Sequence, residues 1–197
     1  MVKSIYLDGC SLVHGPGLQD KDRLAELFRN PGDYIVKDQS RLGKSNLAIV
    51  MDTYKNYKDY DIMVLGFTYS SRFYMQYQGQ DLDFFPGFHG TGLQLDTTTN
   101  SGELEASFLE VYKYFYSTFE SPFCDQMSDT IIDGLLSFLK QQGKTVIAFS
   151  WEPRTLVNEC DFPYLGPKHR LPDNHLNASG THYLFDRLQQ RIYDQQG

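Results

Sequence analysis

Two residues whose side chains can move protons stand close together near the C-terminus, in the stretch LPDNHLNASGTHYLFDRL (171–188). Asp173 and His175 are two positions apart, and Pro172 before them restricts the backbone. A histidine can accept a proton near neutral pH, and a neighbouring carboxylate can fix its tautomer and stabilise its charged form. The pair therefore indicates a general base with its orienting acid.

A nucleophile for such a base is available at the other end of the chain. Ser11 directly follows the strand-like segment KSIYLDGC (3–10). A serine hydroxyl becomes a good nucleophile when a base takes its proton. Ser11, His175 and Asp173 together therefore predict a catalytic triad. A nucleophilic Cys10 paired with the histidine is an alternative, although a small buried packing residue is the simpler interpretation of this cysteine.

The order of the other elements explains how residues so far apart in the chain can meet. Compact apolar runs predict strands, and apolar residues at helical spacing predict helices. The predicted strands cover 3–10, 31–38, 60–70 and 144–151, and the predicted helices cover 20–30, 45–58, 102–120, 128–143 and 177–196. Ser45 or Asn46 is expected to cap the second helix and Asn177 the last.

This alternation predicts one α/β domain over 1–197, a three-layer sandwich with a mainly parallel central sheet. Ligands of such folds bind beyond the carboxyl ends of the strands, which is where the triad residues stand. The segment 70–102 breaks the alternation after the third strand and is rich in aromatic residues, Gly and Thr. We interpret it as an insertion with a hairpin or two, able to form one wall of a cleft for sugar rings.

Composition excludes several classes of partner. The formal net charge of −7 and the absence of a Lys/Arg cluster disfavour nucleic acid. No run approaches the roughly 18 apolar residues of a membrane span, and the N-terminus lacks the pattern of a signal peptide, so a cytoplasmic protein is expected. The three cysteines fit neither a disulfide framework nor a zinc site. No metal or other cofactor is expected, and the oligomeric state stays open.

Two short motifs resemble a known family. GCSLVHG (9–15) resembles the first block of the SGNH/GDSL hydrolases, and DNHLNASG (173–180) resembles their last block. The resemblance implies a flavodoxin-like three-layer sandwich and the activity of an esterase, lipase, thioesterase, or carbohydrate acetylesterase or acyltransferase. It also implies Ser11 as nucleophile, His175 as base and Asp173 as orienting acid. Small SGNH-like proteins from phages and surface-glycan gene clusters are similar in having Gly-Cys-Ser first.

The family's oxyanion hole has a less complete counterpart in this chain. The motif LGKSN (42–46) offers a glycine for the second block, but the third block, Gly-x-Asn-Asp, has no literal copy, and GFTYSSRF (66–73) stands in its place. By this resemblance the oxyanion hole would use Ser11, Gly43, Ser45, Asn46 and Thr68. Apart from the resemblance, Arg72 after the third strand is expected either to form a structural ion pair or to bind an anionic group of the substrate as a bidentate fork, with Ser71 beside it in substrate binding.

The sequence thus favours a serine esterase or acyl hydrolase that acts on a small-molecule or glycan ester, with an acylated carbohydrate as the expected substrate. The joint presence of Ser11, His175 and Asp173 favours an enzyme. The missing asparagine favours the alternative, a catalytically silent module that keeps the fold for binding or assembly. An O-acyltransferase would use the same acyl-enzyme and is a further alternative.

Overall fold

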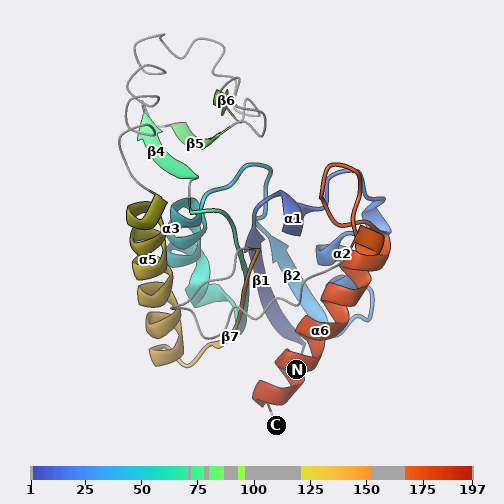
Figure 1. Ribbon diagram of the computed structural model, residues 1–197. Helices are drawn as coiled ribbons and strands as arrows, with labels where there is room; N and C mark the ends of the chain where they lie inside the picture. The colour runs from blue at the N-terminus through green and yellow to red at the C-terminus, as the bar shows by residue number, and fades with distance from the viewer. Residues whose placement is uncertain are drawn as a thin grey trace.

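The centre of the molecule is a four-stranded parallel sheet (Figure 1). The computed structural model of the chain describes residues 2–70, 72–77, 80–86, 93–95, 121–151 and 167–196. The strands are β1 (Lys3–Gly9), β2 (Tyr34–Asp38), β3 (Ile62–Phe67) and β7 (Thr145–Ser150), in the order β2-β1-β3-β7. Gly9 pairs with Gly66, and Gly66 with Phe149, so the carboxyl ends of three strands meet at one edge. The predicted flavodoxin-like α/β fold class is confirmed.

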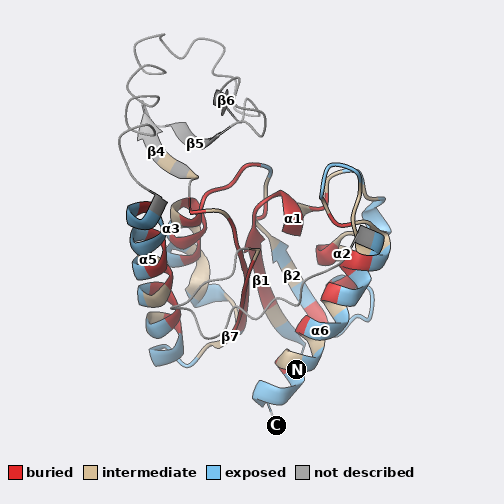
Figure 2. Cartoon of the chain, in the orientation of Figure 1, coloured by how far each residue is buried: buried red, intermediate tan, exposed pale blue. Residues whose placement is uncertain are grey.

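Helices cover both faces of this sheet and make the three layers. The helices α2 (Leu24–Arg29) and α6 (Ala178–Gln196) cover one face, and α3 (Asn46–Asn56) and α5 (Ser121–Gln141) cover the other (Figure 1). The strands of the sheet are largely buried, whereas α5 and α6 turn exposed faces to solvent (Figure 2). Each face therefore has its own apolar core, built from β-branched and aromatic residues of the strands and one stripe of each helix.

The ends of the helices agree with the sequence in part. Ser45 caps α3, where its Oγ accepts from the Ala48 N–H at 3.2 Å, and Asn177 caps α6. The 3₁₀ turns η1 (Asp20–Asp22) and η2 (Tyr57–Asp59) flank α2 and α3 and shorten both relative to the predictions. In contrast, α5 begins seven residues before the predicted start at 128, because a proline is tolerated in a first helical turn.

A second, separate sheet follows β3. It consists of β4 (Phe73–Tyr77), β5 (Gln80–Pro86) and β6 (Leu93–Leu95), antiparallel and in that order. A hairpin was expected in this part of the chain, and β4 and β5 form one (Figure 1). The boundaries of the insertion at 70–102, and the single domain over 1–197, stay predictions. The helix predicted at 102–120 lies outside the described residues. None of the helices that the structure describes is long and apolar enough to cross a membrane.

Candidate active site

Ser11 begins a single helical turn, α1 (Ser11–His14), directly after β1. This turn is too short for a periodic signal in the sequence. It sits close against the sheet because Val13 packs onto two glycines at the strand ends. A Cβ built on Gly9 or Gly66 would lie 2.3 or 2.4 Å from Val13 Cγ2, so any larger residue would push the turn away. The close approach fixes Ser11 at the carboxyl edge of the sheet.

His175 lies on a loop between the 3₁₀ turn η3 (Pro167–His169) and α6. The Leu171 N–H donates to the His175 carbonyl at 2.7 Å, and the Asn177 N–H donates to the His169 carbonyl at 3.0 Å. Leu176, next to the histidine, is buried in the core between the sheet and α2 and α6. The loop is thereby anchored on both sides of His175.

Helix α6 allows this loop to lie flat against its first turn. A Cβ on Gly180 would lie 2.3 Å from the His169 carbonyl oxygen, so this position has no space for a side chain. The Asn177 side chain links the two segments, since it accepts from the Gly180 N–H and donates to the Lys168 carbonyl, both at 2.9 Å. Contacts between residues close in sequence therefore help to fix the path of the loop.

Asp173 holds His175 at two points. Its Oδ1 accepts from the His175 backbone N–H at 3.1 Å, and its Oδ2 lies 3.0 Å from the ring Nδ1. The Nδ1 atom makes no hydrogen bond of good geometry, and its contact with Oδ2 is an ion pair only when the imidazole is protonated. The His175 side chain lowers the pKa of the Asp173 carboxyl below its usual range, and the His175 backbone N–H adds to this effect.

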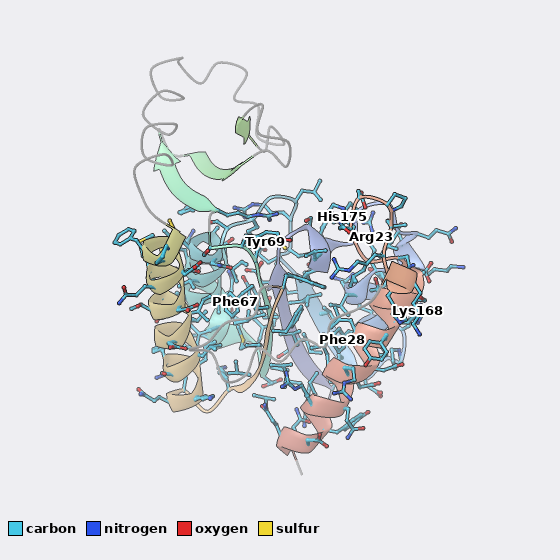
Figure 3. The ribbon with its side chains drawn as sticks, viewed as in Figure 1. Arg23, Phe28, Phe67, Tyr69, Lys168 and His175 are labelled. Carbon is cyan, nitrogen blue, oxygen red and sulfur yellow. The ribbon has the colours of Figure 1, made fainter. Side chains whose placement is uncertain are left out.

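Ser11, Asp173 and His175 line one cavity of about 410 Å³. Among the described residues, the cavity is also lined by Leu12, Tyr69, Arg72, Trp151, Arg170, Pro172 and Asn174. Figure 3 shows Tyr69 and His175 at the same end of the sheet. The described contacts include no hydrogen bond between Ser11 and His175, and catalytic hydrogen bonds of this kind often tighten only when substrate binds. The structure thus brings the three predicted catalytic residues and Arg72 together.

Most of the residues predicted for the oxyanion hole are not among those that line the cavity. The Asn46 amide donates to the Thr68 carbonyl at 2.9 Å and to Ser128 Oγ at 2.8 Å, and its oxygen accepts from the Thr68 N–H. Both amide hydrogens of Asn46 are therefore engaged in joining α3 to the end of β3 and to α5. Ser45 serves as the cap of α3. Their role as oxyanion donors stays a prediction, and Ser71 lies outside the described residues.

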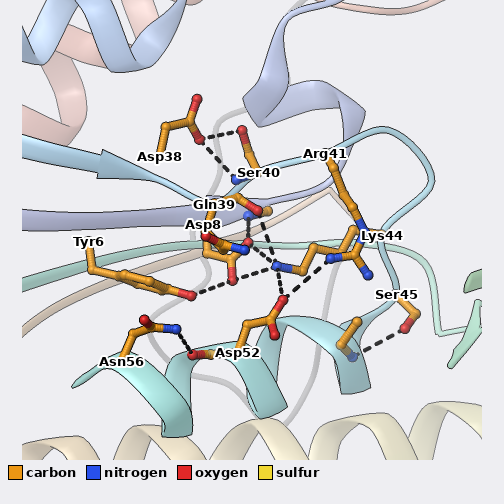
Figure 4. A network of polar contacts seen from close by, with 12 residues as sticks. Tyr6, Asp8, Asp38, Gln39, Ser40, Arg41, Lys44, Ser45, Asp52 and Asn56 are labelled. Carbon is orange, nitrogen blue, oxygen red and sulfur yellow. Dashed lines mark hydrogen bonds and ion pairs between the residues drawn. The ribbon is translucent and has the colours of Figure 1, made fainter. Parts of the chain in front are cut away.

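Sequence reasoning missed a buried ionic network beside this site (Figure 4). The Lys44 ammonium lies 2.7 and 2.8 Å from the two Asp8 oxygens and 2.7 Å from Asp52 Oδ2. Lys44 and Asp8 have no exposed surface. Asp8 also accepts from the Tyr6 hydroxyl and from the Gly9 N–H. A single lysine after a glycine is typical of an exposed loop, so the sequence carries no signal for this network.

Burial and charge act against each other within the network. Burial raises the pKa of the Asp8 carboxyl to about 7, although Lys44 opposes the shift. Burial also opposes ionisation of Asp52, but the attraction of Lys44 and Arg41 lowers the pKa of Asp52 below its usual range. The less buried carboxylate is therefore the firmer ionic partner of Lys44, and Asp8 can hold a proton near neutral pH.

The network also ties a loop to the sheet. The segment between β2 and α3 is bonded to β1, since the Gln39 N–H donates to the Leu7 carbonyl at 2.9 Å and the Arg41 N–H to the Gly9 carbonyl at 3.2 Å. Gly43, predicted as an oxyanion donor, lies buried in this segment with a left-handed φ of 71°. The loop that carries Gly43 is thus held next to the strand that leads to Ser11.

Comparisons with known proteins find similarity to solved structures only. No family model matches the chain, and no curated protein matches its sequence. The solved structure of the psychrotrophic esterase EstA from Pseudoalteromonas sp., inhibited by monoethylphosphonate, is similar with a TM-score of 0.55 and 11% identity, over 98% of this chain and 97% of that one.

Two further structures overlap less closely. One is a lipolytic protein of the G-D-S-L family from Veillonella parvula, with a TM-score of 0.41 and 10% identity over 97% of this chain and 98% of that one. The other is a GDSL-like lipase from Bacteroides thetaiotaomicron, with a TM-score of 0.42 and 10% identity over 98% of this chain and 88% of that one. The chain shares the three-layer α/β fold of the Pseudoalteromonas esterase, in agreement with the fold that the SGNH/GDSL resemblance implies. Among the described residues, no group of three or more His, Cys, Asp or Glu could hold a metal ion.

Proposed function

We propose that this protein is a serine hydrolase of ester bonds, in which Ser11 is the nucleophile, His175 the general base and Asp173 the orienting acid. One observation carries the proposal: these three residues, which come from opposite ends of the chain, line a single cavity at the carboxyl edge of the sheet. The 3.0 Å contact between His175 and Asp173, and the fold shared with an esterase, support it further.

The proposed reaction follows from the positions of these groups. Ser11 Oγ attacks the ester carbonyl carbon while His175 takes its proton, and the carbonyl electrons move onto oxygen. Collapse of this tetrahedral intermediate breaks the bond to the alcohol, which takes the proton from the imidazolium and leaves an acyl-enzyme. Water, deprotonated by His175, then releases the acid and restores Ser11. Asp173 stabilises the imidazolium in both halves of the reaction.

The oxyanion in this proposal is stabilised first by the backbone of Ser11. The N–H of the first residue of a helical turn has no partner within the helix, so the Ser11 N–H suits an oxyanion at the attacked carbonyl. The Gly43 N–H is proposed as the second donor, because its loop is bonded to the end of β1. Ser45 and Asn46 would act only if their present structural hydrogen bonds were exchanged.

The proposed substrate is a small ester, with an acyl group on a carbohydrate as the most suitable form. Tyr69 and Trp151 line the cavity with Ser11, and aromatic faces offer apolar surface on which sugar rings can stack. A volume of about 410 Å³ is within the range of small-molecule sites.

The decisive experiment is labelling with a fluorophosphonate, which forms a stable tetrahedral adduct on an activated serine. We expect an adduct on Ser11, located by mass spectrometry, that disappears in Ser11→Ala and is strongly reduced in His175→Ala. The matched control is His182→Ala. This histidine makes a similar contact with Asp22, at 3.2 Å, but on the surface of α6 and away from the cavity, so labelling should persist.

Two outcomes would contradict the proposal. A folded protein without an adduct on Ser11, and without turnover of small acetyl esters, would favour a binding module with a hydrolase fold. An adduct on Cys10 would assign the nucleophile to the thiol. The full burial of Cys10 argues against that, so Cys10→Ala should keep the label on Ser11.

A further inference from the structure

The cavity gathers positive charge in a protein that is negatively charged overall. Arg72 and Arg170 both line it beside Ser11, while the chain carries a formal net charge of −7. Among the lining residues that the structure describes, Asp173 is the one carboxylate, and it is paired with His175. A cleft lined by charge of one sign focuses the field and raises the local concentration of oppositely charged ligands. Two arginines therefore line the space in which an ester would bind.

The positions of both arginines are set by the elements that build the site. Arg72 follows β3, and its guanidinium lies 5.5 Å from the centre of the Tyr69 ring, with Nη1 3.5 Å from the Lys44 carbonyl oxygen. Arg170 precedes the His175 loop, and its Nη1 donates to the Asn174 carbonyl at 3.3 Å. One arginine is thus positioned by the strand that neighbours β1, and the other by the loop of the proposed base.

The partial burial of Arg72 and Arg170 bears on the kind of ligand that the cavity can bind. Both arginine residues are half-buried, so each gives up part of its hydration at the cavity wall. An anion bound between them would be attracted to both guanidinium groups. The planar guanidinium matches a carboxylate or a phosphate through two parallel hydrogen bonds, a geometry that a lysine does not provide.

We propose that the ester substrate carries an anionic group, a carboxylate or a phosphate, that Arg72 and Arg170 bind while Ser11 attacks the ester carbonyl. This inference rests on the proposed esterase function and adds the charge of the substrate to it. Stacking on Tyr69 and Trp151 beside the two arginines suits an acylated sugar with an acidic substituent. Arg72 and Arg170 are specificity-determining residues in this proposal, whereas the bond-breaking steps belong to the triad.

The test compares an anionic ester with a neutral ester of similar size. We would measure kcat/KM for 4-acetoxybenzoate and for its methyl ester, in the wild type and in Arg72→Gln and Arg170→Gln. The ratio of wild type to variant cancels the intrinsic reactivity of each ester. Loss of a charged hydrogen-bonding partner should lower kcat/KM for the anionic ester about 10- to 100-fold. The loss for the neutral ester should be at least about tenfold smaller.

Three controls sharpen this result. Arg187→Gln removes the same charge from an exposed position on α6, so it separates overall charge from a local site. Arg72→Lys keeps the charge but not the planar fork, and should restore only part of the loss. A third ester, 4-acetoxyphenyl phosphate, distinguishes a phosphate from a carboxylate. The site prefers the anionic group whose ester loses more kcat/KM in the arginine variants.

The outcomes distinguish failure of this inference from failure of the proposed function. Equal losses on the anionic and neutral esters would mean that the arginines stabilise the oxyanion, and would overturn the inference while leaving the esterase intact. If no ester is turned over and Ser11 is not labelled, the esterase proposal fails. Calorimetry with 4-hydroxybenzoate and with phenyl phosphate then tests whether the two arginines still form an anion site. Binding weakened by Arg72→Gln and Arg170→Gln would support an anion site, and no binding would overturn it.

Discussion

Two pairs of basic and acidic groups lie near the same edge of the sheet, and they differ in their access to water. Lys44 and Asp8 are completely buried, whereas the side chains of His175 and Asp173 are 27% and 62% exposed. The buried pair is surrounded by further partners, with Asp52 and the Tyr6 hydroxyl in contact (Figure 4). The same pairing of base and acid is thus used in two different solvent environments.

The difference explains why the two pairs can serve different purposes. A buried charge that loses its partner has no water to replace it, so the Lys44 network resists change and holds the loop of Gly43 against β1. An exposed pair contributes little to stability, but it can exchange protons with solvent and change its contacts at low cost. The rigid network supports the site, and access to solvent suits the exposed pair to the proposed proton transfer.

The largest expected effect is on catalysis, from the exposed pair. In His175→Ala, kcat for a small acetyl ester should fall about 10⁶-fold, because no base remains for Ser11. The free energy of unfolding should change little, since the side chain is partly exposed. Kinetics and urea unfolding on the same preparation check both statements. His182→Ala is the control and should alter neither value. An active His175→Ala protein would contradict the comparison.

The next largest effect is on stability, from the buried network. Lys44→Met leaves two carboxylates without their shared cation, and should lower the free energy of unfolding by about 3–5 kcal/mol. Urea unfolding measures the loss. If the variant does not fold, Lys44→Met combined with Asp52→Asn should restore folding, because it removes the charge of the firmer ionic partner of Lys44. A Lys44→Met protein as stable as the wild type would show that the network does not hold the loop.

A smaller effect is expected when only the acid of the exposed pair is changed. Asp173→Asn keeps the shape but loses the charge that favours the imidazolium. Replacing a buried triad aspartate costs about 10⁴-fold, and solvent around Asp173 should reduce this to about 10²-fold in kcat. Stability should stay within about 0.5 kcal/mol of the wild type. Unchanged kcat would remove Asp173 from the mechanism and leave His175 to act alone.

The sequence predicts this exposed pair far better than the buried network, for a physical reason. Asp173 and His175 are neighbours in the chain, and the caps of Ser45 and Asn177 are equally local, so short-range patterns reveal them. Lys44 and Asp8 are separated by 36 positions, and nothing in either neighbourhood indicates their contact. The buried strands were predictable because continuous apolar runs must form the centre of a parallel sheet.

The same limit applies to the rest of the site. The turn α1 depends on the close packing of Val13 against Gly66, a contact between segments that no periodicity connects. The motif LGKSN predicts Asn46 as an oxyanion donor, yet its amide is bonded to Thr68 and to Ser128, which is 82 positions away. Arg170 and Arg72 line the same cavity only because the loop before α6 folds back to the carboxyl ends of the strands. Motifs thus predict which residues matter, and long-range packing determines what each one contacts.

The smallest expected effect separates the two carboxylates by their response to pH. Asp8 has a folded-state pKa of about 7, above its unfolded value of ~3.9, so between these values the folded protein binds more protons than the unfolded chain. The contribution of Asp8 to the free energy of unfolding is complete below the unfolded-state pKa. It is lost as pH rises through the folded-state pKa. The stability difference between wild type and Asp8→Asn should therefore fall between pH 5 and pH 8.5, measured by urea unfolding. The pKa of Asp173 is lowered, so its contribution is lost only in acid and the difference for Asp173→Asn should be flat over this range. A difference for Asp8→Asn that is flat or rises would mean that the attraction of Lys44 outweighs burial, and the network would then be a fully ionised salt bridge at every pH tested.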